Sequence, residues 1–296
     1  MLNFEQVNLI KDKRIIEYLK KQNYRICDYT PLTIYMWQDF FRCKYAIYDD
    51  FLFLKNKDIE GQVVFSFPVG NGDINKALNY LSEYATKNNL PLLFGLVPKS
   101  GLEILKNHFK DKLEFTTTLG NSDYLYLAGD LINLEGNKYR NQRNRINKFI
   151  RTFGDFKYQK ITTESIPKLK KFMEIYQNEH IDKGGLYDYE NQKTIEVLEN
   201  YDKFELLGGY ISLGDEVIGF AIGEILGDTL FMHIEKALAF YAGAYQVINN
   251  AFVTNSINEQ VKYVNLEEDM GDQGLRKSKM SYHPYQLLEK FNVIIL

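Results

Sequence analysis

The chain has 296 residues, of which 45% are hydrophobic and 25% are charged, and its formal net charge is -3. This length suggests two domains, or one large one. The apolar fraction, together with 22 tyrosines and 20 phenylalanines, excludes an intrinsically disordered chain. The small negative charge excludes a protein that binds nucleic acid over its whole surface, so an anionic partner needs a local basic patch.

Cysteine usage and hydropathy indicate the compartment. The two cysteines, Cys27 and Cys43, are too few for a disulfide framework, and neither lies in a CxxC motif. We therefore expect reduced, buried thiols in a cytoplasmic protein. The four histidines lack metal-ligand spacing, so no metal site is predicted. Residues 237–258 carry no charge but include five asparagine or glutamine side chains, which is too polar for a transmembrane segment.

Hydropathy patterns predict the secondary structure in chain order. The first half reads as a helix at 9–21, strands at 43–48, 51–55 and 62–68, a helix at 73–88, a strand at 91–97, a helix at 100–109, and strands at 112–118 and 123–127. The second half reads as helices at 138–151, 164–179 and 191–200, strands at 204–211, 216–224 and 229–236, a helix at 243–261, a strand at 263–267, a helix at 272–282 and a strand at 286–295.

The same order of elements therefore occurs twice. Three antiparallel strands are followed by a helix, a strand, a helix and a strand, although the halves share little residue identity. This succession predicts an α/β fold with mixed sheets. It resembles the element order of the GCN5-related acyltransferase fold, so we expect two such tandem domains, at 1–135 and 136–296.

A basic segment at 138–151 has the most unusual composition, with six basic residues and no acid. As a helix it places Arg140, Asn144 and Arg151 on one face, opposite apolar side chains. Because charges this dense repel one another, we expect a bound anion, and guanidinium groups suit phosphate or carboxylate. A solvated basic face is the alternative. The candidate anion-binding residues here are Lys138, Arg140, Arg143 and Asn144.

An acidic run followed by basic residues lies at 266–285. Strand alternation would place Glu267 and Asp269 on one side, where either carboxylate could act as a base or orient an amine. We expect Glu267 and Arg143 to meet at one site. The alternative is a surface acid run paired to the basic helix that follows. The further candidate anion-binding residues are Arg276, Lys277 and Lys279.

A glycine-containing turn opens the helix predicted at 243–261. The N–H groups of a helix start bind phosphate, and glycine permits close approach of a ligand. Gly243, Ala244 and Tyr245 are therefore candidate cofactor-binding residues. The turn lacks the full Gln/Arg-x-x-Gly-x-Gly/Ala pattern of acyltransferases, so an ordinary turn is the alternative.

Three segments resemble signatures of one family. They are DYLYLAGDLINLEGNKYRNQRNRINKF (123–149), EKALAFYAGAYQVINNAF (235–252) and NLEEDMGDQGLRKSKMSYHP (265–284). The resemblance is to the phosphatidylglycerol lysyltransferase C-terminal-domain family, in its small stand-alone branch, and it covers nearly the whole chain. It implies two GCN5-like domains related to Fem-type transferases, which take an amino acid from aminoacyl-tRNA. The polytopic region of the membrane-bound lysyltransferases is not part of this sequence, so we expect acyl or aminoacyl transfer rather than lysyl-lipid synthesis.

Together these features predict an acyl- or aminoacyltransferase. An amine or hydroxyl of a small-molecule or peptide acceptor would attack an acyl-CoA thioester or an aminoacyl-tRNA ester, with acyl-CoA slightly favoured as the donor. Glu267 or Asp269 would be the base, and the basic residues would hold phosphates. The alternative is a non-catalytic binding module with a transferase fold that recognises an anionic ligand or RNA.

Overall fold

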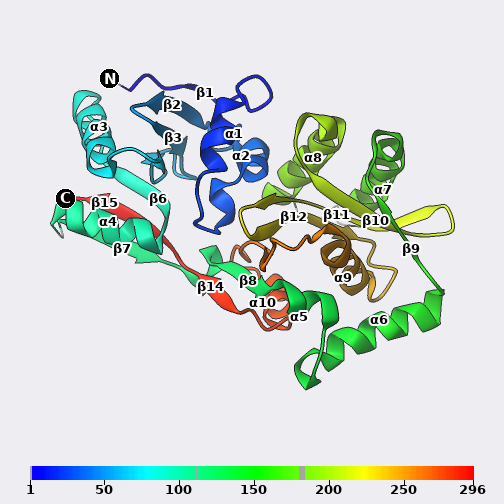
Figure 1. Cartoon of the computed structure of the whole chain (residues 1–296). Coiled ribbons are helices and arrows are strands. Elements are labelled where there is room, and N and C mark those ends of the chain that lie inside the picture. Colours follow the sequence, from blue (N-terminus) through cyan, green and yellow to red (C-terminus); the bar gives the residue numbers. More distant parts are fainter. Residues whose placement is uncertain (1, 111, 180–183) are drawn as a thin grey trace. The chain divides into compact units, whose positions relative to one another are not determined.

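The computed structural model describes residues 2–110, 112–179 and 184–296 (Figure 1). It divides into two compact units, each built from more than one segment. Unit 1 comprises Met1–Asp123, Glu268–Gln273 and Leu287–Leu296. Unit 2 comprises Tyr124–Glu267 and Gly274–Gln286. None of the described helices has both the length and the hydrophobicity that a membrane span requires.

Unit 1 is built on one mixed sheet with the strand order β1-β2-β3-β4-β6-β15-β7, and β5 pairs with β3. The strands are β1 (Glu5–Gln6), β2 (Lys44–Tyr48), β3 (Phe51–Lys57), β4 (Val63–Phe65), β5 (Val69–Gly70), β6 (Leu93–Pro98), β7 (Leu113–Thr117) and β15 (Lys290–Ile295). The helices are α1 (Arg14–Leu19), α2 (Pro31–Trp37), α3 (Ile74–Lys87) and α4 (Lys99–Phe109). Fully buried phenylalanines from three strands, Phe53, Phe65 and Phe94, form part of its core.

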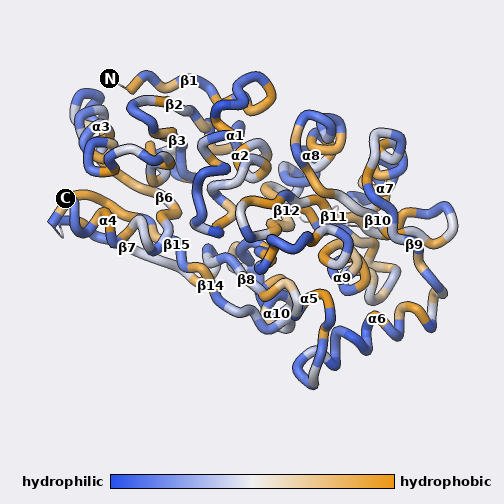
Figure 2. Tube along the Cα trace, in the orientation of Figure 1, coloured by the Kyte–Doolittle hydropathy of each residue, from blue (hydrophilic) through white to orange (hydrophobic). Residues whose placement is uncertain are grey.

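The sheet of unit 2 has the order β14-β8-β13-β12-β11-β10-β9. The strands are β8 (Asp123–Leu127), β9 (Lys157–Lys160), β10 (Leu207–Leu213), β11 (Glu216–Leu226), β12 (Thr229–Ala237), β13 (Tyr263–Asn265) and β14 (Gln286–Leu288). The helices are α5 (Ala128–Asn133), α6 (Arg140–Phe153), α7 (Ile166–Asn178), α8 (Leu186–Glu199), α9 (Ala244–Ser256) and α10 (Gln273–Met280). Helices α7 and α8 cover one face of this sheet and α9 covers the other (Figure 1). Hydrophobic residues are concentrated along β11 and β12, which these helices enclose (Figure 2).

Each sheet combines antiparallel strands with a parallel pair joined through a helix. In unit 1, β4 and β6 are parallel and α3 lies between them in the sequence. In unit 2, β12 and β13 are parallel and α9 connects them. Parallel neighbours need a crossover connection, and a helix commonly supplies it. This repeated arrangement confirms the predicted α/β fold with a mixed sheet in each of two units.

The strand predicted at 286–295 is in fact two strands in two different sheets. β14 ends the sheet of unit 2, whereas β15 lies between β6 and β7 in unit 1 and pairs with both. Residues 1–135 therefore lack one strand of the unit 1 sheet, and the compact units differ from the predicted division at 135/136. Hydrophobic periodicity identifies a strand but does not identify its neighbours, because strand neighbours come from distant parts of the chain.

A β-bulge interrupts β12. Ile222 pairs with Ile234 and Gly223 pairs with Met232, so His233 has no opposite residue on β11. Gly223 permits this arrangement, since a Cβ atom there would lie 2.1 Å from the carbonyl oxygen of Phe231. A bulge re-aims side chains and shifts the alternation of the strand beyond it by one residue.

Candidate functional site

The candidate site lies along β12 of unit 2, where this strand extends beyond its neighbour. β13 pairs with β12 only at residues 229–231. β12 continues to Ala237, so on its β13 side residues 232–237 have no strand partner in the described part of the chain. We call residues 232–237 the β12 edge. It carries the bulge residue His233 and two charged residues, Glu235 and Lys236. Of its six residues only Glu235 is not buried, and the backbone of an unpaired strand edge can hydrogen-bond to a ligand that reaches it.

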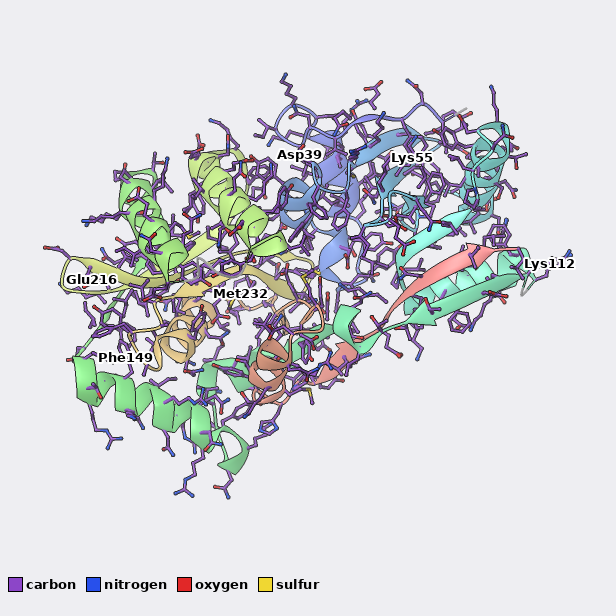
Figure 3. The ribbon with its side chains drawn as sticks, turned by 180° about the vertical axis from the view of Figure 1, so that it is seen from behind. Asp39, Lys55, Lys112, Phe149, Glu216 and Met232 are labelled. Carbon is purple, nitrogen blue, oxygen red and sulfur yellow. The ribbon has the colours of Figure 1, made fainter. Side chains whose placement is uncertain are left out.

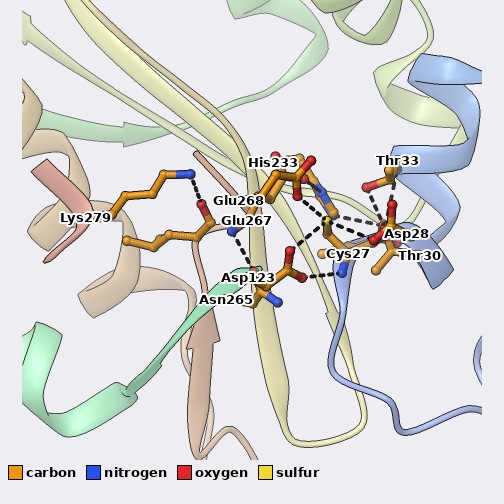
Figure 4. A network of polar contacts seen from close by, with 12 residues as sticks. Cys27, Asp28, Thr30, Thr33, Asp123, His233, Asn265, Glu267, Glu268 and Lys279 are labelled. Carbon is orange, nitrogen blue, oxygen red and sulfur yellow. Dashed lines mark hydrogen bonds and ion pairs between the residues drawn. The ribbon is translucent and has the colours of Figure 1, made fainter. Parts of the chain in front are cut away.

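His233 is a buried imidazole held by the two carboxylates of Glu224 and Glu267, of which Figure 4 labels Glu267. Its Nδ1 lies 2.7 Å from Oε1 of Glu267. Its Nε2 lies 3.1 Å from Oε1 of Glu224, an ion pair without the alignment of a hydrogen bond. Burial alone would lower the pKa of His233, but the contacts with Glu224 and Glu267 raise it to about 9. His233 is therefore an imidazolium at neutral pH.

We expect the protein to lose stability between pH 6.5 and pH 9 because of His233. Its folded-state pKa of about 9 lies above the ordinary 6.5, so the folded state binds more protons in this window. The stabilisation is complete below pH 6.5 and is lost as the pH rises through 9. Thermal unfolding followed by circular dichroism from pH 6 to 9.5 should show the decline, and His233→Gln should lack it. A wild-type Tm that does not change over this range would contradict the charged imidazole.

Glu267, a predicted catalytic base, is the anion in this pair. β13 ends at Asn265, and Glu267 has a φ of +59°, so the expected strand alternation through Asp269 does not occur. The side chain of Asn265 accepts a hydrogen bond from the Glu267 amide at 2.6 Å. Because His233 already neutralises Glu267, the geometry favours a structural role for this carboxylate.

Asp269, the other predicted base, lies in unit 1 and has no exposed surface. Its Oδ1 accepts a hydrogen bond from the Gly271 amide at 2.8 Å, and its carbonyl oxygen accepts one from the Asp272 amide at 2.8 Å. These bonds hold the turn before α10. Because both bonds serve the local turn, this geometry also favours a structural role for Asp269.

Glu235 is a half-buried carboxyl two residues beyond the bulge. Burial raises the pKa of Glu235 to about 7, although a hydrogen bond from Asn249 and the charge of Lys279 lower it in part. It makes no ion pair with any residue that the structure describes. A carboxyl with this pKa exchanges its proton near neutral pH, as a general base must. The sequence analysis assigned no role to Glu235, and the available signal was a pair of adjacent charges, Glu235 and Lys236, near the end of a largely apolar strand.

Lys236 lies on the α7 and α8 side of the sheet. Its Nζ is 2.6 Å from Oε1 of Glu190 and 5.3 and 5.4 Å from the rings of Tyr176 and Tyr187. The hydroxyl of Tyr176 lies 3.3 Å from that of Tyr245, which belongs to the first turn of α9. Tyr245, predicted as a cofactor-binding residue, is thus linked to the tyrosines around Lys236.

The turn before α9 is explained by helix packing. Gly243 has a φ of +102°, and a Cβ atom there would lie 2.9 Å from the carbonyl oxygen of Arg145 and 3.2 Å from Cβ of Phe149. Phe149 is the fully buried residue of α6 labelled in Figure 3. The amide of Ala244 donates to the carbonyl oxygen of Tyr241 at 2.8 Å. This glycine lets α6 approach α9, so the geometry favours an ordinary turn over a pyrophosphate cradle.

Two of the predicted anion-binding residues near α6 are engaged within the protein. Arg143 donates to the carbonyl oxygens of Leu134 and Gly136, the latter at 2.8 Å. Lys138 pairs with Asp130 at 2.9 Å. Because the partners of Arg143 are carbonyl groups, it does not form the predicted pair with Glu267.

Other residues of α6 point to solvent, and Figure 2 shows this helix as largely hydrophilic. We define the α6 face as Arg140, Asn144, Lys148 and Arg151, which are all exposed. Lys157 and Lys160 extend the positive charge onto β9, the edge strand of the sheet. An anion site on the α6 face therefore stays a prediction.

The basic residues of α10 differ from one another in their exposure and in their contacts. Lys279 donates to the carbonyl oxygen of Leu266 at 2.6 Å, and the Tyr126 hydroxyl donates to the carbonyl oxygen of Lys279 at 2.8 Å. Lys279 thus holds the chain that leaves β13. Arg276 is half-buried and Lys277 is exposed.

A separate buried cluster in unit 1 surrounds Lys290, whose side chain is 1% exposed. Its Nζ lies 2.5 Å from Oδ2 of Asp28, 2.6 Å from Oδ1 of Asp123 and 3.0 Å from Oε2 of Glu268. The Cys27 thiol contacts the same carboxylates (Figure 4), and its Sγ lies 3.4 Å from Nζ of Lys290. Burial raises the pKa of Asp28 and raises that of Asp123 to about 6. Burial would also raise the pKa of Glu268, but Lys290 holds it at about 2.

Solved structures share the fold of this chain. A conserved protein of unknown function from Bacteroides thetaiotaomicron matches with a TM-score of 0.92 and 31% identity, over 100% of both chains. L-PGS from Bacillus licheniformis matches with a TM-score of 0.66 and 13% identity, over 95% of this chain and 91% of that one. FemX matches with a TM-score of 0.68 and 9% identity, over 99% and 97%. The last two similarities concern the fold alone.

Sequence comparisons give one relative and one family model. An uncharacterized protein of Mycoplasmoides gallisepticum is 24% identical over 181 residues, and the match spans 59% of this chain and about half, 56%, of that relative. The family model for the C-terminal region of phosphatidylglycerol lysyltransferase matches residues 21–294. The chain belongs to this family.

Proposed function

We propose that the protein transfers an aminoacyl group from an activated ester to an amine or hydroxyl acceptor at the β12 edge. The observation that carries this proposal is Glu235, a carboxyl with a pKa of about 7 on an unpaired strand edge. Membership of a lysyltransferase family and the fold shared with FemX support group transfer of this kind.

The proposed chemistry needs a base and a place for the reacting groups. Glu235 accepts a proton from the acceptor, whose nitrogen or oxygen then attacks the ester carbonyl carbon. The carbonyl oxygen becomes an oxyanion, which backbone N–H groups of an unpaired edge are suited to stabilise. When the intermediate collapses, the C–O bond to the leaving group breaks and that oxygen takes up a proton. Holding both reactants along one strand lowers the entropic cost of their meeting.

Aminoacyl-tRNA is the favoured donor, which departs from the sequence-based preference for acyl-CoA. The turn at Gly243 has a packing explanation, so the argument for a CoA pyrophosphate site loses support. The exposed cations of the α6 face and of β9, by contrast, suit a chain of phosphates. Each phosphate contact by Arg or Lys adds affinity that falls as salt increases.

A transfer assay with labelled aminoacyl-tRNA and acyl-CoA tests the donor. Wild-type protein should use aminoacyl-tRNA, and the triple variant R140A/K148A/R151A should raise the KM for tRNA about tenfold or more at low salt, with kcat unchanged. The difference should shrink as salt rises. A matched control removes three exposed lysines of unit 1, in K76A/K99A/K112A, and should leave KM unchanged. Transfer from acyl-CoA alone would contradict the donor assignment, and no transfer from either donor would contradict the activity.

A further inference from the structure

We infer that Glu235 and Asn249 together bind a primary ammonium group, and that the acceptor attacking at the β12 edge is an amine. The acceptor role rests on the proposed function and deepens it. Ammonium binding itself requires no transfer activity, so the two claims are separately testable.

Asn249 provides the first observation. It lies on the side of α9 that packs against the sheet, and it is 2% exposed. Its Nδ2 is 3.9 Å from Sδ of Met232, a residue of β12 labelled in Figure 3, and its side chain hydrogen-bonds to Glu235. Its Oδ1 has no hydrogen-bond partner among the described residues. Buried carbonyl oxygens in native proteins are normally satisfied, so this atom indicates a missing donor.

Glu235 provides the second observation. Its carboxylate has no ion-pair partner in the described ranges, although unpaired carboxylates are costly to bury. Lys279 attracts it through space, but the Nζ atom of Lys279 donates to the carbonyl oxygen of Leu266. The other titratable groups that interact with it are tyrosines, namely Tyr126 of β8, Tyr245 of α9 and Tyr282. The site therefore contains the Glu235 carboxylate, which pairs with no cation of the described residues, and Oδ1 of Asn249, to which none of them donates.

A primary ammonium group matches this arrangement. It carries three N–H donors and a positive charge, so it can bond to the Glu235 carboxylate and to Oδ1 of Asn249 together. A hydroxyl carries one hydrogen and no charge, and would leave one acceptor unsatisfied. Tyrosine rings also attract cations. Tyr245, one helical turn before Asn249 on α9, is 38% exposed.

The reaction then follows from the bound amine. The ammonium nitrogen gives one proton to Glu235 and attacks the ester carbonyl carbon, so that a C–N bond forms. The C–O bond of the ester breaks, and the leaving hydroxyl takes the second proton that the nitrogen loses. The products are an amide, the free hydroxyl of the donor and one proton, which passes from Glu235 to solvent.

Binding measurements by NMR titration test the site with matched probes. Wild-type protein at pH 8 should bind n-butylamine and not n-butanol. Glu235→Gln and Asn249→Leu should each weaken n-butylamine binding about tenfold, whereas Glu259→Gln, a change at an exposed carboxylate, should not. Equal binding of the amine and the alcohol, or unchanged binding by Glu235→Gln, would overturn the inference. If a variant does not fold, the pH dependence of the wild-type protein tests the inference instead. Glu235 gains a proton between pH 8 and pH 5.5, so n-butylamine binding should weaken over this range. Binding that does not weaken would also overturn the inference.

A second pair of probes separates the two sources of an ammonium group. One is a non-hydrolysable donor mimic, 3′-alanylamino-3′-deoxyadenosine, and the other is its N-acetylated form. We expect Glu235→Gln to affect n-butylamine and to leave both adenosine probes unchanged. If it weakens only the free-amine adenosine probe, the ammonium belongs to the donor and the amine-acceptor assignment is overturned.

Discussion

Replacing Lys290 by methionine should destabilise the protein by about 3–5 kcal/mol, the cost of removing one partner from a buried ion pair. Its ammonium lies within 3.0 Å of three carboxylates and is 1% exposed, so the variant leaves buried anions without a cation. Urea unfolding at pH 7 measures the loss. Lys112→Met, at an exposed lysine of the same unit that Figure 3 labels, is the matched control and should behave like wild type.

The pH dependence of unfolding and a second substitution test whether uncompensated carboxylates cause the loss of stability in Lys290→Met. Lowering the pH towards 4 should shrink the deficit of Lys290→Met, because protonation removes the uncompensated charges of the carboxylates. Adding Asp123→Asn to Lys290→Met should restore part of the stability, since the two side chains are 2.6 Å apart and their effects are coupled. A deficit that is small at pH 7, or that does not change with pH, would show that the cluster is more hydrated than its burial indicates.

Glu235→Gln should lower kcat for transfer by about 10²–10⁴-fold, the usual contribution of a general base. The wild-type protein should become more active as the pH rises through about 7, where Glu235 loses its proton, and the variant should lack this acidic limb. The steady-state kcat and its pH profile are the measurements, with Glu259→Gln as the control.

Stability separates this catalytic role from a structural one. Because the Glu235 carboxylate has no ion-pair partner among the described residues, the neutral glutamine should leave Tm unchanged or raise it. A large fall in Tm together with the fall in kcat would mean that Glu235 maintains the fold. A normal kcat in a folded variant would remove Glu235 as the base.

Local patterns predicted the elements well. The helix predicted at 73–88 is α3 (Ile74–Lys87), and the basic helix predicted at 138–151 is α6 (Arg140–Phe153). Both predictions depend on side chains that recur with the helical period within one segment. The repeated order of elements predicted the α/β class for the same reason, because each element carries its own pattern.

Two residues that the sequence analysis named lie beside the β12 edge. Tyr245 does lie near the β12 edge, and Glu267 contacts the bulge residue His233. Glu235 was missed, because composition and spacing do not distinguish one carboxylate from another. A carboxylate becomes a base or a structural anion according to what surrounds it, and for these two residues the surroundings are Asn249 and His233.

By itself, the sequence determined the family, the class of fold and the basic character of α6, since these follow from motifs and local periodicity. Only the tertiary structure decided which strands are neighbours in a sheet and which charged side chains form ion pairs. It placed β15 between β6 and β7, far from its neighbours in the sequence, and brought Lys290 to Asp123. It also engaged Arg143 with carbonyl groups while leaving Arg140 exposed on the same helix. Burial and partner choice set the role of each charge, and both arise only when distant segments pack together.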